Sequence, residues 1–218
     1  QGDRATTATV IGPGVIGQTS ALALDSALDS LETLRVLHPE QWKAEAFAEE
    51  MADDIDAAIE PMSQARAAVT GADVTVVAAT GSPPPKIEGS WLKDDCLVIP
   101  LGDLRADLSA FDADLIFCDV RRNTLEFAAH MDWQIMNALG AAVDYNIGLE
   151  LAESDLRALH EVVGGEDTAS TEGRSVLYSP GLPMEDVAWA SRVYETAAER
   201  DLGRTLTMFE EPYFSKPY

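Results

Sequence analysis

Three glycines near the amino terminus have the spacing of a phosphate-binding turn. Gly12, Gly14 and Gly17 form a G-x-G-x-x-G pattern, with Val15 and Ile16 between the last two. In such a turn the first glycine makes the bend, the second lets the backbone approach a pyrophosphate, and the third lets helix and strand pack closely. The phosphates would bind the N–H groups that open the helix, so Val15 and Ile16 join the glycines as candidate cofactor-binding residues. A glycine loop without a ligand is the alternative.

The residues on either side of the turn predict a βαβ unit. An apolar, β-rich run from Ala8 precedes the glycines, and apolar residues at helical spacing follow from Val15 to Leu28. Thr33 to Leu37 is a β-branched and aliphatic strand. This setting makes the glycine pattern specific, and it favours nucleotide binding over a loop without a ligand.

The rest of the chain alternates between apolar runs and helical patterns. Ala72 to Ala79 is a near-continuous apolar run, which is typical of a parallel strand buried on both faces. The other predicted strands are Ile55–Ile59, Cys96–Leu101, Asp114–Asp119 and Ser175–Tyr178, and the predicted helices are Glu40–Met51 (with Trp42, Phe47 and Met51 inward), Met62–Val69, Thr124–Ala138, Ser154–Val163 and Pro183–Arg200. The alternation predicts an α/β fold with a Rossmann-type, doubly wound parallel sheet. We expect residues 1–140 to form a dinucleotide-binding domain, completed by a helical extension and tail at residues 141–218.

Two loops are predicted to lie at the edge of the sheet where parallel strands end. Residues 80–85 read Thr-Gly-Ser-Pro-Pro-Pro, and the prolines exclude both a helix and a central strand. Gly102 and Asp103 follow the next strand along the chain. Ligands of open parallel sheets bind at this edge, so both loops are candidate parts of a site.

The charge of the chain argues against some classes of partner. The net charge of −23, from 38 acidic and 15 basic side chains, would repel nucleic acid and anionic membrane surfaces. No apolar stretch approaches the ~18 residues of a membrane helix, and no secretory signal is visible, so we expect a soluble protein of the cytoplasm. Cys96 and Cys118 are expected to be buried thiols rather than a disulfide. No metal-binding motif occurs, and we predict no metal site.

Several segments, taken in order, resemble one protein family. They are Val10–Gly17, Lys43–Phe47, Gly71–Thr80 with Ser82 and Pro83, Gly102 with Asp103, and Ser179–Ala188. Over most of its length the chain resembles the ornithine cyclodeaminase/mu-crystallin family. The resemblance implies a homodimer whose Rossmann domain binds NAD or NADP beside a separate domain for dimerisation and substrate. It also implies hydride transfer between the nicotinamide and the Cα of an amino acid or a cyclic imine.

The resemblance also assigns roles to individual residues. Thr80 and Ser82 match positions that flank the adenosine and nicotinamide ribose. Asp103 matches an acid that in cyclodeaminases lies near the nicotinamide and the substrate amine, where a carboxylate takes up a proton or stabilises an iminium. The alternative for Asp103 is an acid that only caps a turn, because the glycine- and proline-rich pattern usual after that acid is absent. The further cofactor-binding positions are Gly81, Leu101, Gly102 and Gly181.

Two departures from the family pattern bear on function. His38 and Pro39 follow the second strand, where an acid would bind the ribose 2′-hydroxyl of NAD or an arginine the 2′-phosphate of NADP. His38 is a candidate contact of the adenosine ribose or a phosphate, or else a loop histidine without a role, and NAD is only slightly favoured over NADP. The family's basic residues that hold the substrate carboxylate lie upstream of the glycine turn and are absent here. We therefore expect a longer polypeptide or a partner chain to supply the substrate domain, on which the C-terminal helices pack.

Two other functions stay open at this point. One is a module that binds the dinucleotide without turnover. The other is the cofactor subunit of a heteromeric enzyme, with the apolar stripe of the last helix and the aromatic residues 209–218 forming the contact.

Overall fold

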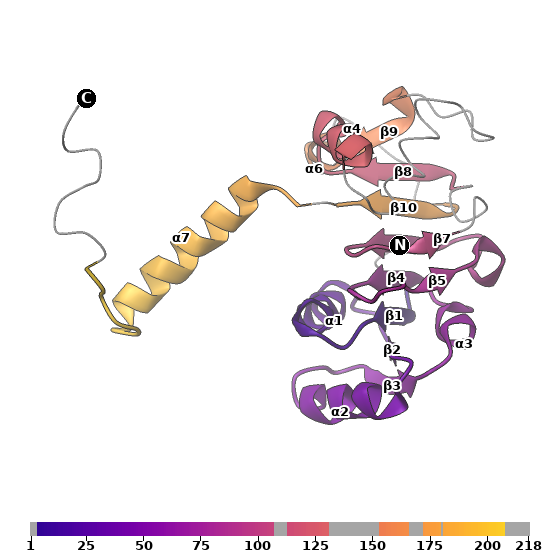
Figure 1. The fold of residues 1–218 in the computed structure, drawn as a ribbon, viewed down its shortest axis with the longest axis horizontal. Coiled ribbons are helices and arrows are strands. Elements are labelled where there is room, and N and C mark those ends of the chain that lie inside the picture. Colours follow the sequence, from indigo (N-terminus) through magenta and orange to yellow (C-terminus); the bar gives the residue numbers. More distant parts are fainter. Residues whose placement is uncertain (1–3, 107–112, 131–152, 166–171, 180, 208–218) are drawn as a thin grey trace. The chain divides into compact units, whose positions relative to one another are not determined.

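The chain forms two units by its internal contacts, Gln1–Pro180 and Gly181–Tyr218. The structure, a computed structural model, describes residues 4–106, 113–130, 153–165, 172–179 and 181–207 (Figure 1). The second part of the predicted helix 124–138 and the aromatic tail at 209–218 fall outside these residues.

Strands and helices alternate along the first unit, as the apolar pattern predicts. The strands are β1 (Thr7–Ile11), β2 (Thr33–Leu37), β3 (Ala58–Met62), β4 (Val74–Val77), β5 (Lys86–Ile87), β6 (Leu97–Pro100), β7 (Arg105–Ala106), β8 (Leu115–Cys118), β9 (Leu156–Ala158) and β10 (Ser175–Tyr178). The helices are α1 (Val15–Ala27), α2 (Gln41–Met51), α3 (Ala65–Val69), α4 (Arg121–His130) and α6 (Leu159–Val163), with short 3₁₀ turns at Gly89–Trp91 and Glu153–Asp155.

The main sheet is parallel and doubly wound. Its described strands follow the order β3-β2-β1-β4-β6-β10-β8-β9, which Figure 1 shows as a stack. The chain leaves β1 towards β2 on one side and later enters β4 on the other, so a topological switch point lies at the carboxyl ends of β1 and β4. The predicted Rossmann-type sheet is confirmed. Residues beyond 140 complete it, because β10 lies between β6 and β8.

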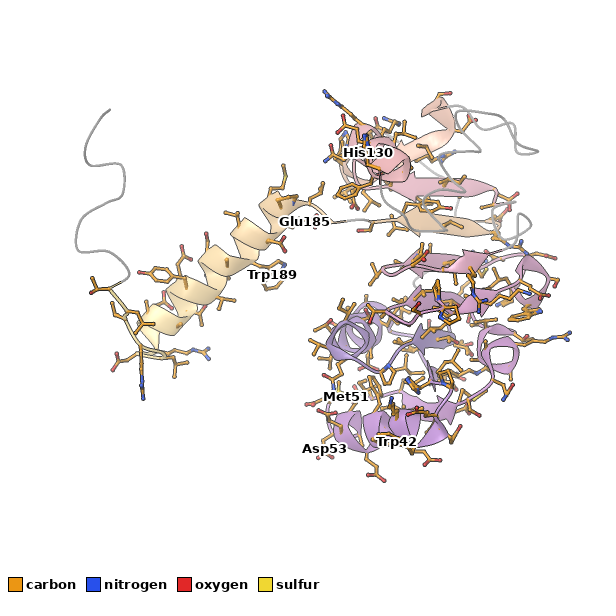
Figure 2. All side chains as sticks on the ribbon, viewed as in Figure 1. Trp42, Met51, Asp53, His130, Glu185 and Trp189 are labelled. Atoms are coloured by element: carbon orange, nitrogen blue, oxygen red, sulfur yellow. The ribbon has the colours of Figure 1, made fainter. Side chains whose placement is uncertain are left out.

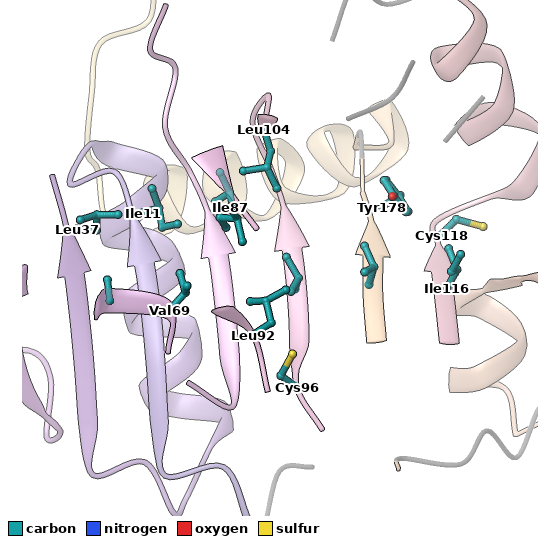
Figure 3. Close-up of a cluster of buried hydrophobic side chains, with 14 of the residues drawn as sticks. Ile11, Leu37, Val69, Ile87, Leu92, Cys96, Leu104, Ile116, Cys118 and Tyr178 are labelled. Carbon is teal, nitrogen blue, oxygen red and sulfur yellow. The ribbon is translucent and has the colours of Figure 1, made fainter. Parts of the chain in front are cut away.

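Apolar side chains hold the strand ends in alignment. The close-up in Figure 3 shows Ile11, Leu37 and Tyr178 near the arrowheads of their strands, in one cluster with Ile87 of β5 and with Leu104, which precedes β7. All five side chains are buried. The core therefore extends to the edge of the sheet where the predicted site lies.

Asp73 fastens the opposite edge of the same strands. Its Oδ2 accepts hydrogen bonds from the backbone N–H groups of Thr6 (2.9 Å) and Thr7 (3.0 Å), and its carboxylate forms an ion pair with Lys93. Burial on its own would raise the pKa of Asp73, but the bonds from Lys93 and from the two amides outweigh it and lower the pKa. The ionised carboxylate thus joins the start of β1 to the segments before β4 and β6.

Trp42 on α2 faces solvent, although the sequence pattern predicts that it faces the core. The predicted helix is confirmed, with Phe47 and Met51 buried, but Trp42 is 62% exposed (Figure 2). Ala44, Phe47 and Met51 share the buried face at helical spacing. Trp42 lies about half a turn from Ala44 and so faces solvent.

Two predicted segments have other boundaries or another type. The strand predicted at Ile55–Ile59 is β3, three residues later, and the helix predicted from Met62 begins at Ala65. β3 is an edge strand of the sheet. Pro61 is tolerated in it because an edge strand can lack a backbone N–H donor on the side that has no neighbouring strand. The prediction of a helix over Ser154–Val163 is wrong for the residues before Leu159. Leu156 and Ala158 are buried in alternation and form β9 against β8, and only Leu159–Val163 is helical.

The second unit consists of one described helix and the segment after it. α7 spans Pro183–Glu199, one residue shorter than predicted, and begins with a proline and with Glu185 and Asp186 in its first turn. Both features favour a helix start. Figure 2 labels Glu185 and Trp189 on this helix. None of its residues is buried.

Across the described residues, no helix is both long and apolar enough to cross a membrane.

Candidate functional site

Gly12 makes the bend after β1 and cannot be replaced without strain. Its φ is +106°, a region that L side chains rarely adopt, and a Cβ there would lie 2.9 Å from the carbonyl oxygen of Ala78. The Gly12 N–H donates to the carbonyl oxygen of Leu37 at 3.0 Å. The bend is thus packed on β4 and tied to the end of β2.

The other two glycines of the turn differ from each other. A Cβ on Gly17 would lie 2.0 Å from the carbonyl oxygen of Gly12, so the helix packs directly on the turn. A Cβ on Gly14 would meet no atom within 4 Å. Gly14 is the N-cap of α1, without a side-chain capping bond and without an acidic residue in the first turn. Val15 and Ile16 follow it and are 75% and 49% exposed, which leaves the start of α1 open to a ligand.

The turns after β4 and β6 lie against this bend. The Ala78 N–H donates to the carbonyl oxygen of Ile11 at 2.8 Å, and the N–H groups of Leu101 and Gly102 both donate to the carbonyl oxygen of Val77. A Cβ on Gly102 would lie 2.5 Å from the carbonyl oxygen of Ala79. The ends of β1, β4 and β6 therefore form one continuous edge, as the loop positions predict.

A pocket of about 850 Å³ opens at the carboxyl ends of β1, β2 and β4. This size lies within the usual range for a small-molecule or cofactor site. Five of the predicted cofactor-binding residues line it: Gly12, Gly14, His38, Thr80 and Gly81. The structure thus brings the glycine turn, the end of β2 and the 80–85 loop around one cavity.

The remaining predicted residues do not line the pocket. Val15, Ile16, Gly17, Ser82, Leu101, Gly102 and Asp103 lie on the same unit outside its lining. The Asp103 carboxylate accepts a hydrogen bond from the Leu104 N–H at 2.8 Å, a contact that the turn-capping alternative predicts. Gly181, with φ of +93°, opens the second unit. Their functional roles stay predictions.

Several lining residues were missed by sequence reasoning. They are Lys43, Ser63, Lys86, Trp91 and Arg105, among others. Lys43 lies in a segment that carries the family resemblance, but helical spacing alone does not say which side of α2 faces a cavity. Lys86 and Arg105 meet because β5 and β7 pair with these two residues in register. Two strands of two residues each leave no periodic signal in a sequence.

The basic side chains at the pocket have defined partners. Lys43 Nζ lies 2.9 Å from Glu40 Oε2, and Lys86 Nζ lies 2.6 Å from Glu88 Oε1. The hydrogen bond from Lys43 lowers the pKa of Glu40. Arg105 Nε donates to the carbonyl oxygen of Pro84 at 2.8 Å. No aspartate or glutamate is among the residues that line the pocket.

One ring nitrogen of His38 is hydrogen-bonded within its own loop. The Glu40 N–H donates to His38 Nδ1 at 3.0 Å, so Nδ1 is an acceptor and the neutral ring carries its proton on Nε2. With Nδ1 engaged by its own loop, Nε2 is the donor that remains for a ligand.

The cysteines are buried and free, as predicted. Burial raises the pKa of both the Cys96 and the Cys118 thiol. Within the part of the chain that the structure describes, no three histidine, cysteine, aspartate or glutamate side chains gather as a metal site would need.

The family model and the individual relatives that match the chain point to the same protein family. A model of the ornithine cyclodeaminase/mu-crystallin family matches residues 2–201. An uncharacterised cyclodeaminase, y4tK of Sinorhizobium fredii, is 26% identical over 207 residues, which are 91% of this chain and 59% of that protein. The ketimine reductase mu-crystallin of Mus musculus is 28% identical over 168 residues, covering 77% of this chain and 48% of that protein.

A solved structure has the same fold. The Δ1-pyrroline-2-carboxylate reductase of Thermococcus litoralis, solved in complex with NADH and L-proline, superposes with a TM-score of 0.77 at 21% identity. The superposition covers 94% of this chain and 62% of that one. The chain thus spans about half to three fifths of the length of the proteins it matches.

Proposed function

Because the chain belongs to the ornithine cyclodeaminase/mu-crystallin family, we propose that it is the dinucleotide-binding part of an oxidoreductase or cyclodeaminase. The reaction acts on the carbon–nitrogen bond of an amino acid or a cyclic imine. The observation that carries this proposal is the pocket at the switch point, which the glycine turn and the 80–85 loop line together.

The turn fits the pyrophosphate of a nicotinamide dinucleotide. The open space at Gly14 and the uncapped N-terminus of α1 offer backbone N–H groups to a phosphate. Gly12 and Gly17 lack side chains because the turn and the helix occupy that space. Thr80 and Gly81 line the pocket beside the turn, where the riboses of the cofactor would contact them.

A nicotinamide cofactor bound here would supply or accept the hydride at the carbon of the substrate's carbon–nitrogen bond. The chain's own contribution is to hold the dinucleotide at the sheet edge and to place a carboxylate near the reacting amine. We assign the second role to Asp103, which follows Gly102, and Gly102 packs on Ala79 of the turn after β4. A carboxylate there takes a proton from an ammonium group or stabilises an iminium as charge develops.

The substrate side requires surfaces beyond those described. α7 carries exposed apolar side chains at Met184 and Trp189, and at Val187, Val193 and Tyr194, which share one stripe of the helix. We propose that this face packs on a substrate and dimerisation domain, supplied by the same polypeptide or by a partner chain. A homodimer assembled through that domain follows from the same proposal.

The first experiment measures binding and turnover separately. Trp91 lines the pocket, so its emission should be quenched when reduced NAD(P)H binds to the 218-residue chain. A Trp91→Phe variant should bind the cofactor with less quenching, which separates this signal from that of the other three tryptophans. Turnover is then assayed with the chain joined to its substrate domain, using Δ1-pyrroline-2-carboxylate and reduced cofactor, and L-proline, L-ornithine or L-lysine and oxidised cofactor.

An Asp103→Asn variant distinguishes an enzyme from a binding module. If Asp103 is catalytic, the variant keeps its affinity for NAD(P)H and loses turnover. Dinucleotide binding without turnover of any of these substrates, when the chain is joined to its substrate domain, would favour the module. Absence of dinucleotide binding would refute the proposed function itself.

A further inference from the structure

The pocket is basic although the chain is strongly acidic. The whole sequence holds 38 acidic and 15 basic residues, yet the lining includes Lys43, Lys86, Arg105 and His38 and no carboxylate. The two lysines are paired with Glu40 and Glu88, which are outside the lining. An anionic ligand in the pocket would therefore meet basic ionisable side chains and no lining carboxylate, in a chain whose overall charge repels anions.

His38, at the end of β2, occupies the position at which dinucleotide-binding folds distinguish NAD from NADP. An acid at this point accepts hydrogen bonds from the 2′- and 3′-hydroxyls of NAD, whereas a cation receives the 2′-phosphate of NADP. His38 occupies the position, hydrogen-bonded by the Glu40 N–H so that Nε2 is left as a donor. Because Nε2–H can only donate, this ring nitrogen cannot accept a hydrogen bond from a ribose hydroxyl.

Lys43 adds a full positive charge beside His38. It belongs to the first turn of α2, and it lines the pocket together with His38 and Pro39. Its ion pair with Glu40 is exposed, with 39% and 55% of the two side chains accessible. Pairs of this kind contribute about 0 to 1 kcal/mol, so a phosphate with nearly two charges can displace Glu40 from Lys43.

We infer that the pocket takes NADP(H) in preference to NAD(H), and that Lys43 and His38 bind the 2′-phosphate. The inference rests on the proposed dinucleotide site and adds its selectivity. It departs from the slight preference for NAD drawn from the sequence, which leaves the choice between NAD and NADP open. Lys43 reaches the pocket from α2.

The test uses adenosine 2′,5′-bisphosphate and AMP, two probes that differ only in the 2′-phosphate and lack the nicotinamide. Titration calorimetry with the full chain measures both dissociation constants. We expect the bisphosphate to bind at least about tenfold more tightly than AMP, which corresponds to about 1.4 kcal/mol. NADPH and NADH should differ in the same direction.

Three variants test the part that Lys43 plays in this selectivity. Lys43→Gln should remove most of the tenfold difference while AMP binding stays within about twofold. Arg122→Gln, which changes the net charge equally at an exposed position outside the pocket, should leave the ratio unchanged. Glu40→Gln should raise the affinity for the bisphosphate, because it frees Lys43 and removes a repelling carboxylate. Circular dichroism checks that each variant is folded.

The outcomes separate the inference from the function on which it rests. Equal affinities for the two probes in the unaltered chain, or an unchanged ratio in folded Lys43→Gln, would overturn the inference and leave the dinucleotide site standing. Weaker binding of AMP to Glu40→Gln would also overturn it, since Glu40 would then be the acid that holds the ribose of NAD. If neither probe nor either cofactor binds, the proposed function fails and the inference falls with it.

Discussion

The carboxyl ends of the strands differ between the two halves of the sheet. Where β1, β2 and β4 end, glycines and prolines keep side chains away and a pocket opens. Where β8 and β10 end, the polar side chains bind one another. Ser179 Oγ donates to Asp119 Oδ2 at 3.1 Å, and Arg121 forms a two-pronged ion pair with Glu161 while its Nε donates to a backbone carbonyl.

The difference shows which strand ends of a parallel sheet leave room for a pocket. All the described strands end in the same direction, but β1 is followed by β2 on one side and flanked by β4 on the other, and this divergence leaves space at their carboxyl ends. In the other half the satisfied polar groups stabilise the fold and have fewer donors left for a ligand. Substitutions at the pocket in the first half should therefore change dinucleotide binding, whether or not they change stability, whereas those in the second half should change stability alone.

Gly17→Ala should have the largest effect on stability. In a helix interior this change normally stabilises by about 0.5 to 1 kcal/mol, because alanine has the higher helix propensity. Here the new Cβ would lie 2.0 Å from the carbonyl oxygen of Gly12, so the helix must move away from the turn. We expect a loss of about 3 kcal/mol in urea unfolding, together with loss of dinucleotide binding. A gain in stability would show that α1 does not pack on the turn in this way.

The glycine turn shows what the sequence can predict. Its spacing within a strand–helix–strand pattern predicts the turn, because Gly12 and Gly17 are positions where a side chain would meet backbone atoms. The parallel strands are also predictable, since Val74–Val77 and similar runs are apolar throughout. The pocket's cations are not predictable, because Lys43, Lys86 and Arg105 meet through the orientation of α2 and the pairing of two short strands. β9 was missed since three residues contain too little alternation to outweigh a helical pattern.

Arg121→Gln should change the stability of the second half without changing the site. The side chain loses its ion pair with Glu161 and its bond to the Leu156 carbonyl oxygen. Hydrogen bonds to charged groups contribute about 1.5 to 3 kcal/mol, and part of this is screened because both side chains are partly exposed. We expect a loss of about 1.5 kcal/mol in urea unfolding.

The neighbouring Arg122 provides a matched control for this change. Its pair with Glu126 is exposed, so Arg122→Gln should change stability by less than about 0.5 kcal/mol. The affinity of both variants for NADPH should stay within about twofold of the unaltered chain. A tenfold loss of affinity in Arg121→Gln would mean that the two halves of the sheet are coupled.

Asp73 makes the stability of the sheet depend on pH in the acid range. Its folded-state pKa is lowered, so its contribution is fully present above the unfolded pKa of about 3.9 and is lost as pH falls through the folded value. At neutral pH, Asp73→Asn should destabilise the chain by about 1 kcal/mol, because the ion pair with Lys93 is removed. The difference between the two proteins should shrink below about pH 4. Urea unfolding midpoints measured across this pH range check the prediction, with Asp54→Asn at an exposed position as a charge control. A difference in stability that stays constant with pH would contradict the role given to the Asp73 carboxylate.

Gly14→Ser should move stability and binding in opposite directions. Gly14 has an extended backbone that serine adopts without strain, and its side chain would enter open space. Serine is a preferred N-cap, so its hydroxyl can accept a bond from the first-turn N–H groups and stabilise α1 by about 0.5 kcal/mol. Those are the same N–H groups that a pyrophosphate needs, and the added side chain also blocks the close approach of the phosphate. We therefore expect a slightly higher unfolding midpoint and an affinity for NADPH that falls about tenfold. Unchanged affinity would mean that the phosphates do not bind at this helix, and the comparison between an open and a closed half of the sheet would lose its functional meaning.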